Sequence, residues 1–200
     1  MGGRTRIEGF HAIGQRRLTQ LLFDNRRYDR ITGFVVFATR LLYTGRLGRD
    51  GNLYPLYLGS TEIVRGNTSG SYERHECNLS VVTYGTCAPF DRLVGTQLAA
   101  FNAELRFPLL NPRMTWVPAG FPALEGAFFA DFGVAWNENN TIKWNRQPGD
   151  DPYSVRSISR TVGFAARLNL FGFTIFKFDY SFPLDRNIRG YWTISLGPVF

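Results

Sequence analysis

The sequence predicts an all-β protein, an antiparallel transmembrane β-barrel of about eight meandering strands. Three observations support this class. Apolar and polar residues alternate with a period of two through most of the second half of the chain, which is typical of strands with two different faces. No segment shows the period of an amphipathic helix. No run reaches the roughly 18 consecutive apolar residues that a transmembrane helix needs.

The first three expected strands alternate least regularly. Residues 3–9 and 15–25 give weak patterns, whereas residues 33–45 are rich in the β-branched and aromatic residues that suit a strand. A long connection follows, from about residue 46 to residue 92. Loops of this length are normally functional or disordered. This connection is therefore the first place to look for functional residues.

Five strands with a clearer alternation follow the long connection. In the first of them the apolar Phe101 alternates with the polar Asn102 and Glu104. The expected ranges are 97–107, 124–136, 160–170, 173–182 and 190–200. The connections alternate between long and short, which would place the long ones at one rim of a barrel and the short ones at the other.

The polarity of the two strand faces favours a membrane barrel over a soluble one. The apolar face is a nearly unbroken band, whereas the other face combines charges of both signs with glycines. A membrane barrel turns its apolar face to lipid and its polar face to the lumen. A soluble core stays an alternative, because aromatic stripes also face cores. Aromatic residues near the strand ends could form interfacial girdles; they are Tyr43, Phe107, Trp116, Trp136, Tyr180, Phe182, Tyr191, Trp192 and Phe200.

The charged residues argue against two other classes of protein. The net charge of +7 comes almost wholly from arginine, since only Lys143 and Lys177 are lysines. The arginines are spread along the chain without a nucleic-acid-binding motif, so no nucleic acid is expected as a partner. No Gly-x-Ser-x-Gly elbow is present, and neither His11 nor His75 has a serine or carboxylate relay at motif spacing. We therefore expect neither an enzyme nor a bound cofactor.

Two cysteines, Cys77 and Cys87, lie in one polar part of the long connection. No histidine or cysteine partner completes a zinc spacing, although His75 is close by. A disulfide that staples the loop is favoured over a metal site. Such a bond would indicate an oxidising compartment.

The same connection holds Val64-Arg65-Gly66 within a glycine-rich stretch. A guanidinium donates up to five hydrogen bonds in a planar fork, so an arginine in a small, bendable loop suits docking on carboxylates. Glu104 and Asp131 are acidic residues in the middle of strand patterns. A lone loop arginine is usually solvated, but these strand acids favour docking. We predict that Arg65 pairs with Asp131 and has Glu104 as a neighbouring acceptor.

An ordered set of motifs resembles the BamA/TamA-type outer-membrane barrel family, also called bacterial surface antigens. The motifs are Val64-Arg65-Gly66, Ala103-Glu104-Leu105-Arg106-Phe107-Pro108, Phe129-Ala130-Asp131-Phe132-Gly133, Phe178-Asp179-Tyr180-Ser181-Phe182-Pro183-Leu184 and the terminal Phe200. The resemblance covers nearly the whole chain, best from residue 58 onward. It corresponds to the C-terminal eight strands of what in that family is a sixteen-stranded barrel.

The resemblance implies which residues form the functional site. The Val-Arg-Gly loop would fold back into the lumen and lock there against two strands, through Val64, Arg65, Gly66, Glu104, Phe129, Asp131 and Gly133. The last strand would carry the family's assembly signal, at Trp192, Ile194, Leu196 and Phe200. One position departs from the family, because Asn67 stands where an aromatic residue is usual.

The resemblance also implies location and function. We expect one integral barrel domain, residues 1–200, in the bacterial outer membrane, with the connection 46–92 outside the cell. It would insert or export client polypeptides and contact outer-membrane lipid. Since no periplasmic POTRA-type domain and no first half of the barrel are present, we expect a C-terminal fragment or short relative of a longer barrel, with other chains completing it. The alternative is a structural or partner-binding barrel, or a small pore, without insertase activity.

Overall fold

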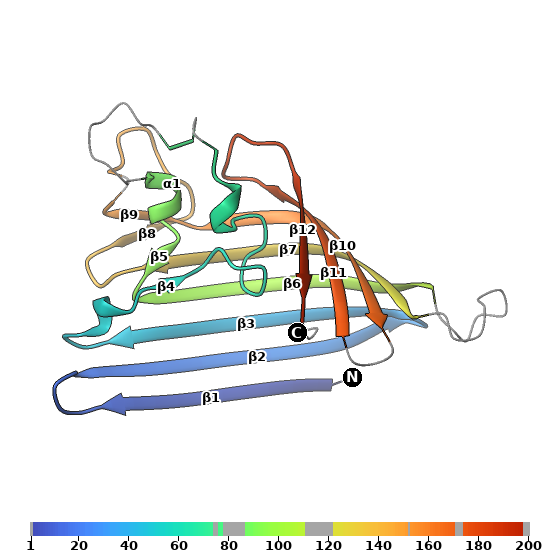
Figure 1. Cartoon of the computed structure of the whole chain (residues 1–200), viewed down its shortest axis with the longest axis horizontal. Helices are drawn as coiled ribbons and strands as arrows, with labels where there is room; N and C mark the ends of the chain where they lie inside the picture. The colour runs from blue at the N-terminus through green and yellow to red at the C-terminus, as the bar shows by residue number, and fades with distance from the viewer. Residues whose placement is uncertain are drawn as a thin grey trace.

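The computed structural model describes residues 2–73, 76–77, 87–110, 122–151, 153–170 and 174–197. Its main element is one antiparallel sheet of eight strands in the order β1-β2-β3-β6-β7-β10-β11-β12 (Figure 1). The strands are β1 (Gly2–Ala12), β2 (Leu18–Thr32), β3 (Val35–Leu47), β6 (Gln97–Leu110), β7 (Leu124–Trp136), β10 (Ser159–Leu170), β11 (Thr174–Pro183) and β12 (Tyr191–Leu196). Because each strand pairs with the next one of the sheet along the chain, the sheet is a meander.

The sheet curves, and its two edge strands do not pair with each other. Among the described residues, β1 pairs with β2 alone and β12 with β11 alone. Figure 1 shows β1, β2, β3, β6 and β7 lying side by side, while β11 and β12 cross the view steeply. β1 runs toward the rim that carries the connection 13–17, and β12 runs away from that rim. The two free edges are therefore antiparallel.

The predicted fold class is confirmed, and the eight expected strands occur in the expected order. The bounds of the first two were wrong. β1 and β2 extend beyond 3–9 and 15–25, because β2 is paired along its length with β1 on one side and β3 on the other. Backbone hydrogen bonds from two neighbours thus maintain a strand whose side chains alternate poorly. The described part of the last strand ends at Leu196, and Phe200 lies outside the described residues.

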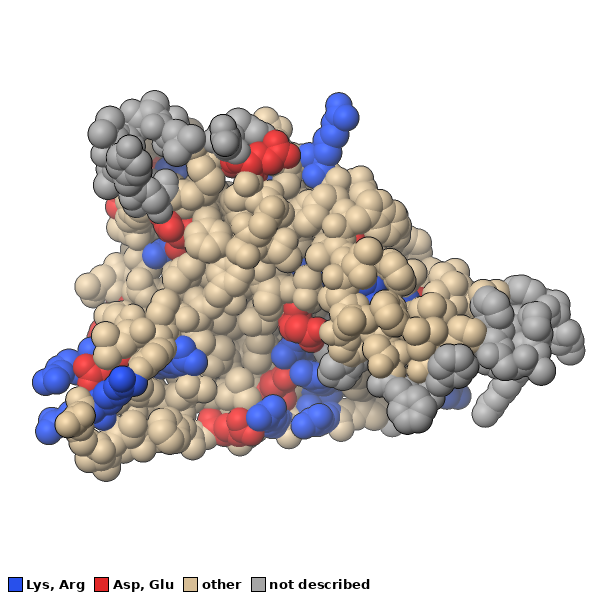
Figure 2. Space-filling view, viewed as in Figure 1, with Lys and Arg blue, Asp and Glu red and all other residues tan. Residues whose placement is uncertain are grey.

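The charged face of the sheet points inward and the apolar face outward. On β6, Glu104 is fully buried and Phe101 is 42% exposed; on β7, Asp131 is fully buried and Phe128 is 58% exposed. A soluble sandwich or barrel fills its interior with apolar side chains, so this arrangement is the reverse of that class. It fits strands with lipid outside and a polar lumen inside. In Figure 2, charges of both signs gather over β1 and β2 and at the left-hand ends of the strands.

Short elements occupy the long connections at one rim. They are η1 (Gly51–Leu53), β4 (Leu56–Tyr57), η2 (Ser69–Ser71), α1 (Ala88–Asp91), β5 (Val94–Gly95), β8 (Thr141–Lys143) and β9 (Val155–Ser157). β4 pairs with β5, and β8 pairs with β9. None of the helices in the described ranges has the length and apolar character needed to cross a membrane.

An apolar cluster lies between the inner face of the sheet and the long connection. Leu42 of β3, Leu98 of β6 and Ala135 of β7 contribute from the sheet, and Leu58 and Val64 contribute from the loop. Leu58 and Val64 are 1% and 0% exposed, respectively. Burying these two side chains against the sheet fixes the segment that carries Arg65.

Candidate functional site

The Val-Arg-Gly loop follows β4 and enters the concave side of the sheet. Gly66 has φ +79, a left-handed conformation that favours glycine, and a Cβ there would lie 2.7 Å from the Thr161 side chain. Gly133 on β7 makes room for the loop, because a Cβ there would lie 2.6 Å from Val64 and 2.8 Å from Leu58. Two of the predicted site glycines thus have steric roles.

The guanidinium of Arg65 lies on the two acids that the sequence singled out. Its Nε and Nη2 donate to the two carboxylate oxygens of Asp131, at 2.7 and 2.8 Å. The backbone N–H of Arg65 also donates to Asp131, at 3.1 Å. Nη1 lies 2.7 Å from Oε1 of Glu104 and 3.8 Å from Oδ1 of Asp179. The structure therefore brings a bidentate pair and a second carboxylate to one buried cation.

Phe129 completes the surroundings of this arginine. The centre of the guanidinium lies 3.6 Å from the centroid of the Phe129 ring, which is a close cation–π contact. Phe129 is inward-facing on β7 and 4% exposed. On the next strand, a Cβ at Gly163 would lie 2.5 Å from the same ring. A small residue on β10 thus leaves space for the ring beneath Arg65.

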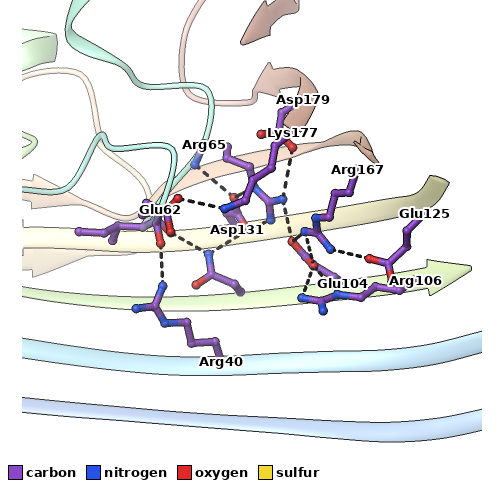
Figure 3. A network of polar contacts seen from close by, with 12 residues as sticks. Arg40, Glu62, Arg65, Glu104, Arg106, Glu125, Asp131, Arg167, Lys177 and Asp179 are labelled. Carbon is purple, nitrogen blue, oxygen red and sulfur yellow. Dashed lines mark hydrogen bonds and ion pairs between the residues drawn. The ribbon is translucent and has the colours of Figure 1, made fainter. Parts of the chain in front are cut away.

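Glu104 is the centre of a wider charge network (Figure 3). Its carboxylate accepts from Arg106 at 2.8 Å and from Arg167 at 2.7 Å, in addition to Arg65. Arg167 also pairs with Glu125 at 3.0 Å. Removing one partner from such a group leaves an uncompensated buried charge, which is far more costly than replacing the whole pair.

A second set of contacts anchors the loop just before Arg65. The carbonyl of Glu62 accepts a hydrogen bond from Arg40 at 2.6 Å, and the Glu62 carboxylate pairs with Lys177 at 3.0 Å. Arg40 in turn pairs with Asp24 at 3.0 Å. The carbonyl of Ile63 accepts from the Asn102 amide at 2.7 Å.

Sequence reasoning missed several members of this network. Arg167, Lys177 and Asp179 lie on the polar parity of their strands, so alternation alone places them on the inner face. Alternation does not say which inner-face charges meet, because that depends on strand register and on the path of the loop. Glu62 lies close to the predicted Val-Arg-Gly motif, but no other feature of the sequence indicates that it belongs to the network.

Asn67 is held by polar contacts at a position where the resembled family usually has an aromatic residue. It is 2% exposed, and its amide nitrogen donates to Ser159 at 3.0 Å and to Thr161 at 3.4 Å. Its backbone carbonyl accepts from the Tyr57 hydroxyl at 2.6 Å. Burial raises the pKa of Tyr57 to about 12, so this hydroxyl stays protonated and can donate. Hydrogen bonds thus fix the loop tip here.

The other predicted residues have clear positions. Cys77 and Cys87 are joined by a disulfide. Trp192, Ile194 and Leu196 are exposed on the outer face of β12, with the Trp192 ring centroid 4.9 Å from that of Tyr180. The predicted girdle residue Trp116 and the terminal Phe200 lie outside the described residues. Within the described ranges, no group of three or more His, Cys, Asp or Glu residues could hold a metal ion.

Comparison with known proteins agrees with this geometry. The family description "Omp85 superfamily domain" matches residues 7–197. A search of curated proteins finds no match. The family match confirms the resemblance to the BamA/TamA-type barrels. Since it spans nearly the whole chain, the protein belongs to the Omp85 superfamily, whose members have a general role in protein assembly and translocation at the outer membrane.

Proposed function

We propose that this chain is a barrel segment that inserts or exports client polypeptides at the bacterial outer membrane, with the Val-Arg-Gly loop bracing its lumen. The observation that carries the proposal is the buried Arg65, which joins the loop to Asp131 on β7, Glu104 on β6 and Asp179 on β11. The same sheet leaves β1 and β12 unpaired with each other. The buried contacts of Arg65 hold the inner face of the sheet together, while β1 and β12 keep backbone groups available for pairing. This combination suits a protein that works by pairing strands.

The loop contacts the inner faces of six strands. Its partners are Arg40 on β3, Asn102 and Glu104 on β6, Asp131 on β7, Ser159 and Thr161 on β10, Lys177 and Asp179 on β11, and Tyr191 on β12. Contacts spread over so many strands fix the curvature of the sheet from within. The edges can then remain available without the sheet flattening.

The free edges suit clients of varied sequence. An edge strand presents unpaired backbone N–H and C=O groups, and pairing through them needs no particular side chains. β1 and β12 run antiparallel, so an added strand or set of strands can continue the sheet between them. A closed eight-stranded barrel leaves an interior just wide enough for side chains. Because residues 58–67 already occupy the concave side, we infer that further strands complete the barrel.

Those strands would come from another chain or from another part of a longer protein. Residues 1–200 would then form one barrel domain, with the connection 46–92 on the extracellular side and the outward apolar face in lipid. Superfamily members act as assembly or transport components, so we propose no enzymatic activity.

A structural or partner-binding barrel is the second candidate, and the same unpaired edges favour it. Here β1 and β12 would bind permanent partner strands instead of passing clients. A small pore agrees less well with the structure, because Arg65 and its partners fill the space beside β6 and β7.

The amount of client barrel in the outer membrane separates these functions. Cells lacking the gene, complemented with Arg65→Ala, should contain less client barrel than cells complemented with the unchanged protein. The matched control is Arg49→Ala, since the Arg49 side chain is 78% exposed and lies between β3 and η1, outside both edge strands. Normal client levels in cells lacking the gene altogether would contradict the assembly function and leave the structural one.

A further inference from the structure

A second arginine, Arg186, donates hydrogen bonds to the same loop, at residues that follow Arg65 in the chain. It lies in the connection 184–190 between β11 and β12. Its five N–H groups all donate: Nε to Glu76 at 2.8 Å, Nη1 to the Gly66 carbonyl at 3.0 Å and the Ser71 hydroxyl at 2.9 Å, and Nη2 to the Ser71 carbonyl at 2.7 Å and Glu76 at 2.7 Å. The fork of donors is therefore fully used.

The surroundings of Arg186 show that this contact is built into the fold. Its side chain is 4% exposed, and that of Glu76 is 7% exposed. The guanidinium lies 3.9 Å from the centroid of the Tyr72 ring. Glu76 directly precedes Cys77, which the disulfide ties to Cys87 at the start of α1. The acceptors of Arg186 are thus anchored on both sides.

The connection that carries Arg186 leads straight into the terminal strand. At the start of β12, the Tyr191 hydroxyl accepts from the backbone N–H of Thr68 at 3.3 Å. At the other end of the connection, Asp185 pairs with Arg160 at 2.7 Å and accepts from its backbone N–H. The tip of the Val-Arg-Gly loop is therefore held by residues whose positions depend on where β12 begins.

We propose that Arg186 is a positioning residue that couples the loop tip to the edge strand β12. When β12 is displaced, the connection 184–190 moves with it, and the five hydrogen bonds that Arg186 donates are broken. Conversely, when the loop is released, the start of β12 loses its contacts with the loop. Coupling of this kind acts equally in both directions. The inference deepens the proposed function, because it rests on β12 being an edge at which strands pair.

Hydrogen exchange of the full chain in micelles tests this coupling. Arg186→Ala should raise amide exchange about tenfold or more at residues 66–72 and at the start of β12, because the lost hydrogen bonds are charge-assisted. β6 and β7 should keep their protection. The control is Arg189→Ala, an exposed arginine in the same connection, which should change neither segment. If amide exchange becomes faster at residues 66–72 while exchange in β12 stays unchanged, Arg186 stabilises the loop alone. That result would overturn the proposal.

Two further variants keep the test decisive. Tyr191→Phe removes only the hydroxyl that Thr68 contacts, and it should raise exchange at 68–72; no change there would contradict the reciprocal coupling. If Arg186→Ala also opens β6 and β7, Arg186→Lys replaces it, since lysine keeps the charge but loses the fork. If Arg186→Lys shows the same protection from exchange as the unchanged protein, the planar set of guanidinium donors is not needed for the coupling, and the proposal is overturned. Because exchange needs no client, these results are independent of the assembly test on Arg65→Ala.

Discussion

The inner face of β6 and β7 and the inner face of β1 carry the same kinds of residue in opposite environments. On β6, Glu104 is fully buried and bonded to Arg65, Arg106 and Arg167. On β1, the Arg6–Glu8 pair faces the same side of the sheet but is about half exposed, at 51% and 53%. The difference is the loop, which covers β6 and β7; among the described residues its hydrogen bonds and ion pairs go to β3 and to β6 and later strands, not to β1.

The contrast bears on what is lost when one member of a charge pair is removed. An exposed pair gains little, because water screens both charges and holding two long side chains still costs entropy. A buried pair has lost its water, so each member depends on the other. Removing one member of a pair is therefore most costly where the loop lies over the sheet. The uncovered charges of β1 mark the edge at which further strands would add.

The largest expected effect comes from breaking the covered pair. Arg65→Ala and Asp131→Ala should each destabilise the docked loop by about 3–5 kcal/mol, because each takes the bidentate partner away from a buried charge. The double variant should cost less than the two single costs added together, since both members of the bidentate pair are then absent. Hydrogen exchange at residues 58–67 measures the three free energies. Fully additive effects would mean that the two residues do not interact.

The outer face offers the next largest effect. Phe178→Arg places a charge on the outer face of β11, which we expect to contact lipid, at a cost of about 2–4 kcal/mol near the middle of the bilayer. Asn169→Arg is the matched control on β10, because residue 169 has the parity of the inner face. Folding yield into lipid vesicles should fall sharply for the first variant and little for the second. Equal yields would rule out the assignment of the apolar face to lipid.

Much of this architecture could be predicted from residue alternation. The period-two pattern in β6, β7, β10 and β11 gave both the strands and their inner faces, since neighbouring side chains point to opposite sides. Alternation predicted β2 poorly, because Asn25, Arg27 and Asp29 are polar yet lie on the outer parity. Pairing with β1 and β3 maintains that strand, and a single sequence does not display such pairing.

The candidate site also has one part that could be predicted from the sequence and one part that could not. The contact of Arg65 with Asp131 was predictable, because an arginine in a glycine-rich loop and an acid on an inner face need each other. Nothing local distinguishes Arg186 from Arg189, which lies in the same connection. Their difference arises from Glu76, which is 110 residues away in the chain and reaches Arg186 through the path of the loop. That the predicted lock serves protein assembly stays a prediction.

A smaller effect is expected at the disulfide, which lies outside the sheet. Reduction of Cys77–Cys87 should loosen the segment that carries Glu76, by about 2 kcal/mol, because the closed ring is short. The sheet should keep its protection. Limited proteolysis of the connection with and without reductant measures this change. Mass spectrometry that finds two free thiols in protein taken from the cell envelope would contradict the bond.

The smallest effect is expected at the uncovered pair on β1. Arg6→Ala should leave the unfolding of the isolated chain unchanged, because the guanidinium and the Glu8 carboxylate are already hydrated. The measurement is hydrogen exchange along β2, which pairs with β1. A clear loss of protection in the isolated chain would contradict the distinction between covered and uncovered charges. The same exchange measurement on Arg6→Ala can be repeated with the protein in membranes. Strands that complete the barrel there would cover the inner face beside β1 and bury the charge pair. Loss of protection that appears in membranes alone would then report that closure.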